Sequence, residues 1–333
     1  MKKVWLWVLV GVLGLSFLAA AGCSPQEVGD ESEEGIMKIG IMQIVDHPAL
    51  NAARDGFIEA LREEGFEEGK NISLDIQNAQ GEITTASTIA EGFAADQVDL
   101  ILAIATQAAE AAFNATKEIP IVITAVTDPV SIGLADSLEH PGKNVTGTHD
   151  MNPIKEQLEL LMEILPEAST VGVIFNSGED NSLIQVDILE EVAGNNFDLT
   201  IIKAPVTTTG EISAAAESLV GKVDAIYIPT DNTVVSAIAS VIQVSEEHLI
   251  PIIPGEESCV REGALATLGI DYFKLGHQTG KMAAKILRGE AEPAVMPIEG
   301  QSEYRVIVNK ITADKLNITL PQSLLERAGE IIE

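Results

Sequence analysis

The chain has 333 residues, of which 20 are Lys or Arg and 51 are Asp or Glu, so its formal net charge is −31. This acid excess excludes binding to nucleic acid or to an anionic membrane surface through a basic patch. The length exceeds that of one typical hydrophobic core and predicts two lobes.

The N-terminus has the pattern of an export signal, MKKVWLWVLVGVLGLSFLAAAGC, in which two lysines precede an apolar run that ends in small residues and Cys23. We expect residues 1–22 to be a signal peptide that is cleaved before Cys23, whose thiol would then be lipidated. Ala20 stands where a bacterial lipobox more typically has Leu, and an uncleaved membrane anchor is the alternative. Residues 23–36 would form the lipid anchor and an acidic tether. The body would be exported and held at the outer face of the bacterial cell membrane, or at its periplasmic face.

The next stretch reads as alternating strands and helices. Residues 37–43 form a short apolar strand, and Pro48 follows His47 at a position that suits the start of a helix. Apolar residues at helical spacing predict a helix that stops at Gly65. A strand at 71–80, a helix at 84–96 and two nearly continuous apolar strands at 98–105 and 119–126 complete the pattern. This alternation is typical of a doubly wound parallel sheet.

The second half of the chain repeats the pattern of the first. A strand and its polar turn at 169–181 are followed by a helix at 182–196, a strand at 199–206 and a helix at 210–222. Two Val-Asp segments, from Val98 and Val223, lead into apolar strands, and an Ile-Pro-Ile segment follows each of them. Any α/β protein can contain similar segments in its two halves, but four elements in the same order favour two lobes of one topology. The predicted fold is therefore α/β, with two similar doubly wound parallel-sheet lobes, a hinge and a cleft between the lobes.

Ligands of open parallel sheets bind beyond the carboxyl ends of the strands, so the turns that follow the strands should line the cleft. The candidate ligand-binding residues in these turns are Gln43, His47, Thr106, Gln107, Thr127, Asp128, Asn176, Ser177, Ser182, Thr230, Asp231, Asn232 and Glu256. Thr106, Asp128 and Asp231 also stand where helix N-caps belong, and capping is the alternative role for them. For His47 a ligand contact and a place beside a helix start are both open.

These turns contain hydroxyls, amides and carboxylates but no Lys or Arg, which argues against a phosphorylated ligand. Both tryptophans, Trp5 and Trp7, lie in the signal segment, so the flat aromatic of many sugar sites is missing from the mature chain. A zwitterion fits better. Helix-start amides with Thr106 and Thr127 would bind a carboxylate, and Asp231 or Glu256 would bind an ammonium group.

Several ordered motifs from about Met37 to the C-terminus resemble the ABC-transporter substrate-binding family whose better-known members bind tryptophan or tyrosine. The segments that carry the resemblance are GIMQIVDHPALNAARDGF, NAQG, AIATQAA, TAVTDPV, NVTG, VGVIFNSGEDNS, LVGKVDAIYIPTDNTV and GALATLGIDYFKLGHQTGKMAAKIL. The resemblance implies a type I periplasmic-binding-protein fold, a hinge of three crossing segments and delivery of an aromatic amino acid to an ABC permease. Gly255-Glu256 departs from the Gly-Asp that such proteins often have, and the longer acid would reshape the ammonium end of the site.

The predicted lobes are residues 37–147 plus 269–297 and residues 148–268 plus 298–333, with Thr148 and Asp271 at the hinge. We expect closure around an amino acid, a monomer, no cofactor and no metal. The alternative is an extracytoplasmic sensor that feeds a signalling partner. A lipid-anchored hydrolase is a third and weaker hypothesis, because the five histidines are scattered and the sequence contains no Gly-x-Ser-x-Gly motif and no phosphate-binding loop.

Overall fold

The computed structural model describes residues 35–301 and 303–333, and residues 35–333 group as one compact unit. The predicted signal peptide, Cys23 and residues 23–34 of the tether lie outside the described residues. Among the described helices, none is both long enough and apolar enough to cross a membrane.

The first sheet has six parallel strands in the order β11-β5-β4-β3-β1-β2. Its strands are β1 (Met37–Gln43), β2 (Ile72–Asn78), β3 (Leu100–Ile104), β4 (Ile121–Val126), β5 (Val145–His149) and β11 (Glu299–Gly300). Its helices are α1 (Pro48–Glu63), α2 (Ile83–Ala95), α3 (Thr106–Ala115) and α10 (Tyr272–Leu287). All residues of β3 and β4 are buried, as expected of strands covered by helices on both faces.

The second sheet has four parallel strands in the order β7-β6-β8-β9. Its strands are β6 (Thr170–Asn176), β7 (Thr200–Val206), β8 (Ala225–Ile228) and β9 (Ile252–Pro254). The associated helices are α4 (Ile154–Ile164), α5 (Asp180–Val192), α6 (Ile212–Leu219), α7 (Asn232–Ser236), α8 (Ile238–His248) and α9 (Glu257–Glu262). When the strands of each lobe are numbered from the first strand of that lobe, both sheets contain the order 2-1-3-4. The two halves of the chain, whose sequence patterns repeat, therefore form sheets with the same strand order.

A third sheet of three strands, in the order β10-β12-β13, was not predicted. It joins β10 (Ala266–Gly269) to the C-terminal strands β12 (Arg305–Asn309) and β13 (Glu330–Ile332), and α11 (Lys310–Lys315) and α12 (Gln322–Arg327) lie between the last two strands. The β10–β12 pair is antiparallel, whereas β12 and β13 are parallel. Short strands that pair with distant segments leave little periodic signal in a sequence.

Each of the two main sheets has its own hydrophobic core. One core combines residues 39–145 with side chains from α10 and Ile298, and two further clusters combine residues 154–324. We call the first group lobe 1 and the second lobe 2; the exact boundaries between them stay predictions. The chain passes between these cores three times, after β5, after β10 and after β11.

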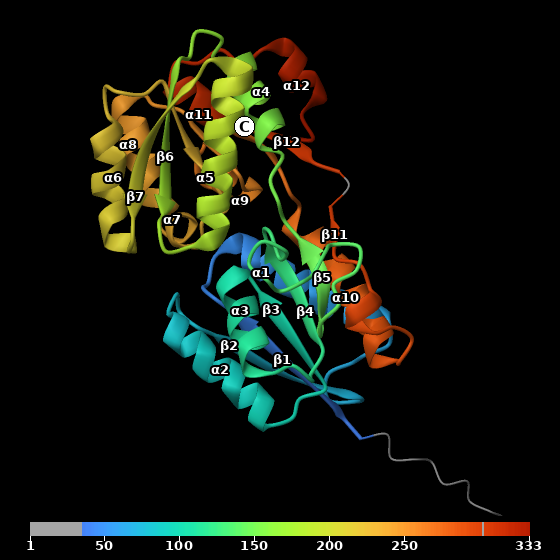
Figure 1. Cartoon of the computed structure of the whole chain (residues 1–333). Helices are drawn as coiled ribbons and strands as arrows, with labels where there is room; N and C mark the ends of the chain where they lie inside the picture. The colour runs from blue at the N-terminus through green and yellow to red at the C-terminus, as the bar shows by residue number, and fades with distance from the viewer. Residues whose placement is uncertain (1–34, 302) are drawn as a thin grey trace, which may run out of the picture. The chain divides into compact units, whose positions relative to one another are not determined.

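Helix α10 packs against α1, β4 and β5, and Figure 1 shows it at the side of β5, although about 200 residues separate it from α1 in the sequence. Gly56 and Gly276 allow the close approach of the two helices. A Cβ at Gly276 would collide with the carbonyl of Ala53, and one at Gly56 would collide with the carbonyl of Phe273. The contact holds the start of α10, whose first residue is Tyr272 and whose N-cap is Asp271.

Candidate functional site

The candidate site lies where the strand order of each sheet reverses, between β1 and β3 in lobe 1 and between β6 and β8 in lobe 2. Turns at such points hold the ligands of doubly wound sheets. Most of the predicted residues are buried there, and the buried polar and charged residues among the described part of the chain include no Lys and no Arg. The structure therefore brings together a polar, cation-free interior at the ends of both sheets.

In lobe 1, polar atoms point into this interior without protein partners. Gln43 is 2 % exposed and donates from Nε2 to the carbonyl of Val45 at 2.6 Å and to Asn51 at 2.9 Å, while its Oε1 accepts nothing from the described residues. Thr106 is the first residue of α3, and its buried hydroxyl likewise has no partner in the described chain. Ala105, just before it, has φ 78°, a left-handed conformation that alanine rarely adopts. Backbone strain of this kind is concentrated at functional sites.

Several predicted residues from the two lobes contact one another. Nε2 of His47 lies 3.5 Å from Oδ1 of Asn232, and Nδ2 of Asn232 lies 3.5 Å from Oε1 of Gln107. The hydroxyls of Thr127 and Thr230 are also 3.5 Å apart. Burial lowers the pKa of His47 to about 4, so its imidazole is neutral at physiological pH. The two lobes thus meet through neutral polar groups.

Two of the buried acids are fully occupied by protein donors. Asp231 caps α7 through a bond from the amide of Val234 at 2.8 Å, and its other oxygen accepts from the amide of Asn176 and from the hydroxyl of Ser182 at 2.7 Å. Glu179 accepts from the amides of Asn232 at 3.0 Å and Thr233 at 2.9 Å. Burial and the neighbouring Glu179 raise the pKa of Asp231, and its three donors oppose that rise. We call Glu179 and Asp231 the structural acid pair.

Two other buried acids have few donors. Asp150, on the first passage between the cores, accepts side-chain hydrogen bonds from two hydroxyls of the described residues, those of Thr127 at 3.1 Å and Tyr272 at 2.7 Å. Glu256, between β9 and α9, accepts from Ser258 at 3.2 Å and lies 4.0 Å from Nδ1 of His47. Burial, followed by the charge of Asp150, raises the pKa of Glu256 to about 8, and burial raises the pKa of Asp150 as well. We call Asp150 and Glu256 the open acid pair.

The remaining predicted residues lie at the margin of this interior or outside it. Asp128 caps a turn by accepting from the amides of Val130 and Ser131, and Ser177 is exposed. Asn176 is half-buried at the end of β6 and donates to Thr233 at 2.8 Å.

The two residues predicted for the hinge have different positions. Thr148 lies inside β5, where its hydroxyl contacts those of Thr124 at 3.1 Å and Thr279 at 2.8 Å, so the first passage starts beyond it. Asp271 caps α10, and its amide donates to Gln301 on the third passage at 2.9 Å.

The sequence analysis missed four buried polar residues of the site, Asp150, Asn152, Gln185 and Tyr272. Gln185 extends from α5 to the hydroxyl of Thr230, and Asn152 donates to Gln185 at 2.9 Å. The run THDMNP (148–153) carries a weak signal for two of them, because it places Asp and Asn just after a buried strand. Tyr272 looks like an ordinary apolar helix residue, and nothing local indicates its bond to Asp150.

A groove of about 520 Å³ opens beside the buried interior. Its walls come from residues 80–84 of lobe 1 and from residues 176–179, 207–209 and 232–236 of lobe 2, and Gln107, Glu179 and Asn232 line its inner end. Hydroxyl side chains of Thr and Ser predominate along it. The groove connects the candidate site with solvent.

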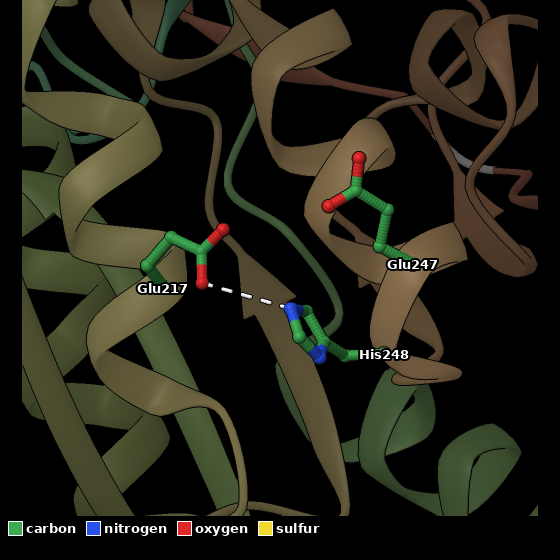
Figure 2. Close-up of side chains that lie close together, drawn as sticks. All are labelled: Glu217, Glu247 and His248. Carbon is green, nitrogen blue, oxygen red and sulfur yellow. Dashed lines mark ion pairs between the residues drawn. The ribbon is translucent and has the colours of Figure 1, made fainter.

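A separate surface group of possible metal ligands comprises Glu217, Glu247 and His248, whose ligand atoms lie within 4.8 Å of one another. Figure 2 shows Glu217 on one helix directed at the imidazole of His248 on another, at 3.6 Å. All three side chains are exposed, and among the described residues no other group orients them as a metal site would require. We assign no metal site there.

The two sheets of like topology, with a polar interior at their switch points, define a type I periplasmic binding protein. Residues 38–332 match the family described as ABC transporter substrate binding protein, and the chain belongs to that family.

Similar proteins agree with this assignment. The chain is 44 % identical over 325 residues to the tyrosine-binding protein of Clostridioides difficile (strain R20291), covering 95 % of this chain and 93 % of the relative. It is similar to the crystal structure of an ABC domain in complex with L-Trp from Streptococcus pneumonia, with a TM-score of 0.86, 36 % identity and coverage of 90 % and 100 %. A ligand-free, open substrate-binding protein with adhesive properties from Clostridium difficile is 46 % identical, with coverage of 89 % and 99 % and a TM-score of only 0.69.

Proposed function

We propose that this protein is the extracytoplasmic receptor of an ABC importer and that it binds a free L-amino acid with an aromatic side chain between its lobes. The chain is anchored through Cys23, acts as a monomer and catalyses no reaction. Its family and the binding proteins among its relatives support the receptor role. The named ligands of the relatives, tyrosine and tryptophan, support the aromatic side chain.

The observation that carries the proposal is the open acid pair. Asp150, just after β5, and Glu256, between β9 and α9, are each 3 % exposed and form no salt bridge with a Lys or Arg of the described residues, and the charge of Asp150 acts on Glu256. An unpaired buried carboxylate is strongly unfavourable. An ammonium group placed between the two acids would supply the missing charge and the missing donors. Asp231, whose oxygens already accept three protein hydrogen bonds, is left with the capping role.

The carboxylate of the amino acid would bind at the start of α3. The first amides of a helix have no partners within it, and the helix dipole favours an anion there. The unpartnered hydroxyl of Thr106 provides a further donor for the carboxylate, whereas the free Oε1 of Gln43 can only accept a hydrogen bond and does not bind the anion. This arrangement divides a zwitterion between lobe 1, which binds the anion, and the open acid pair, which binds the cation.

Binding would close the two lobes by bending the three passages between the cores. Three polar contacts between the lobes, each at 3.5 Å, support a closed arrangement. The two solved relatives support it too, because the L-Trp complex superposes better than the open protein despite its lower identity. The closed form is the shape that a permease would recognise.

A thermal-shift screen of the purified chain with free amino acids, sugars and nucleosides tests the proposal. A ligand at a thousandfold excess over its Kd should stabilise the protein by about 4 kcal/mol. L-tyrosine or L-tryptophan should raise the melting temperature, and the deaminated analogue 3-(4-hydroxyphenyl)propionate should not. A shift with a sugar or nucleoside, and none with any amino acid, would show that the proposal is wrong.

A further inference from the structure

A second pocket, which we call the hinge pocket, lies between the start of α1, helix α9 and the start of α10. It has a volume of about 360 Å³. Ala49 and Ala52 of α1 and the half-exposed ring of Phe273 form its apolar wall, and Glu257, Asp271 and Arg305 contribute its polar side. Both lobes and the second passage between them therefore contribute walls, and none of these residues belongs to the amino-acid site.

One carboxylate oxygen at this pocket has no donor. Glu257 is only 5 % exposed; its Oε2 accepts from Arg261 at 2.9 Å, while Oε1 accepts nothing from the described residues. Arg261 also pairs with Glu330 at 2.9 Å, and Arg305 pairs with the same Glu330. The two guanidinium groups balance Glu257 and Glu330, and the further lining acids Glu262 and Asp271 leave the pocket with an excess of negative charge. Burial raises the pKa of Glu257. A buried acceptor of this kind requires a donor, and a cationic donor satisfies it best.

One donor at the same pocket is also unpartnered. Nε of Arg305 is buried and donates to nothing in the described chain. A ligand that uses both atoms must carry a positively charged N–H group and an oxygen that accepts a hydrogen bond. The small side chains of Ala49 and Ala52 leave room for an apolar body beside Phe273.

Two residues connect the hinge pocket with the open acid pair. Tyr272 lines the pocket, and its hydroxyl donates to Asp150 at 2.7 Å. Ser258 also lines the pocket, and its hydroxyl donates to Glu256 at 3.2 Å. Helix α1 belongs to lobe 1 and α9 to lobe 2, and the two helices lie against each other, so an occupant held between them would favour this lobe arrangement. Coupling between two sites is reciprocal, so each ligand would strengthen the binding of the other.

We propose that the hinge pocket is a second binding site, for a small primary amine that carries an apolar body and a hydroxyl or carbonyl oxygen, and that its occupation increases the affinity of the interlobe site. The claim that the hinge pocket binds such an amine depends only on the pocket and its unpartnered atoms. The coupling part rests on the proposed function, because it needs a ligand between the lobes.

Alanine methyl NMR on the purified chain tests the binding part, with L-phenylalaninol as the probe, titrated first into the chain without amino acid and then into the chain with L-tyrosine in excess. The methyl signals of Ala49 and Ala52 should shift on titration, whereas that of Ala204 in the second sheet should not. The neutral analogue 3-phenylpropan-1-ol should bind at least tenfold more weakly. Equal binding of that analogue, or unmoved Ala49 and Ala52 signals at millimolar probe, would overturn the site.

Two variants separate recognition from folding. Ala52→Leu fills the pocket from a partly exposed helix position and keeps every charge, so it should abolish binding of the probe while the amino acid still binds. Glu257→Gln should weaken the probe about tenfold or more. Calorimetry of the amino acid with and without the probe tests the coupling, and we expect an increase of about fivefold in affinity. An affinity that the probe leaves unchanged would overturn the coupling, and an Ala52→Leu variant that binds the probe normally would overturn the site.

Discussion

The site contains two pairs of buried carboxylates that look alike in the sequence and differ in their surroundings. In the structural acid pair, Glu179 and Asp231 receive hydrogen bonds from backbone amides at the ends of β6 and α7. In the open acid pair, Asp150 and Glu256 accept side-chain hydrogen bonds from the hydroxyl groups of Thr127, Tyr272 and Ser258. The first pair binds the turns of lobe 2 to one another, whereas the second pair is left for a ligand.

The difference teaches that burial and charge do not by themselves identify the residues that contact a ligand. All four acids are at most 3 % exposed. The two pairs differ in the number and kind of hydrogen-bond donors that the protein already provides. A carboxylate whose two oxygens both accept from backbone amides gains little from an ammonium group. Each of the following predictions changes one member of a pair.

The largest expected effect is on ligand affinity when the open acid pair loses a charge. Glu256→Gln and Asp150→Asn should each weaken amino-acid binding by about 2–5 kcal/mol, because the ammonium loses a buried charge partner. The empty protein should be about as stable as the wild type in Glu256→Gln, because Glu256 is already protonated below pH 8 and the substitution removes no charge from the folded state. Calorimetry with L-tyrosine gives the affinity and thermal unfolding gives the stability. Binding that survives both substitutions unchanged would remove the open acid pair from the site.

The next effect is a dependence of affinity on pH. The pKa of Glu256 in the empty folded protein is about 8, above its ordinary value of 4.5, so between these pH values the folded empty protein holds a proton that the unfolded chain does not. Stability of the empty protein should therefore fall as pH rises towards 8. An arriving ammonium group expels the proton, so affinity should rise with pH up to about 8, by at most about tenfold per pH unit for one proton.

In the window from pH 6.5 to 8 His47 does not contribute, but the pKa of Asp231 is raised to about 7 and this acid also titrates there, so the Glu256→Gln variant is needed to separate the two acids. The pKa of His47 is lowered from 6.5 to about 4, so His47 is largely neutral in both the folded and the unfolded states above pH 6.5. Titrations in two buffers of different ionisation enthalpy should reveal proton release on binding, and Glu256→Gln should abolish most of it. A pH-independent affinity in the wild type would contradict the assignment of Glu256.

The smallest effect is expected for the structural acid pair, and it falls on stability. Asp231→Asn replaces an acceptor oxygen with an NH₂ group and leaves a buried donor unsatisfied, either the amide of Asn176 or that of Val234, at a cost of about 1–3 kcal/mol. The affinity measured on the folded fraction should change much less than in Glu256→Gln. A large affinity loss with unchanged stability would make Asp231 a ligand contact instead.

The sequence predicted the fold well because hydrophobic runs and turns recur in the same order in both halves. It also located the turns that follow β1, β3, β6 and β8, since these positions follow from the strands alone. It could not assign roles to the acids. One carboxylate oxygen of Asp231 accepts a hydrogen bond from the amide of Asn176, which lies 55 residues earlier in the chain. Asp150 lies on the first passage between the cores and Tyr272 starts α10, 122 residues later, so only the packed structure brings them together.

A crystal structure of the complex with L-tyrosine tests the central claim most directly. The account predicts that the ammonium nitrogen lies within hydrogen-bond distance, about 2.7–3.2 Å, of a carboxylate oxygen of both Asp150 and Glu256. The amides that bind Asp231 and Glu179 should remain in place. An ammonium group bound by Asp231 or Glu179, or a ligand confined to the groove outside the buried interior, would contradict the account.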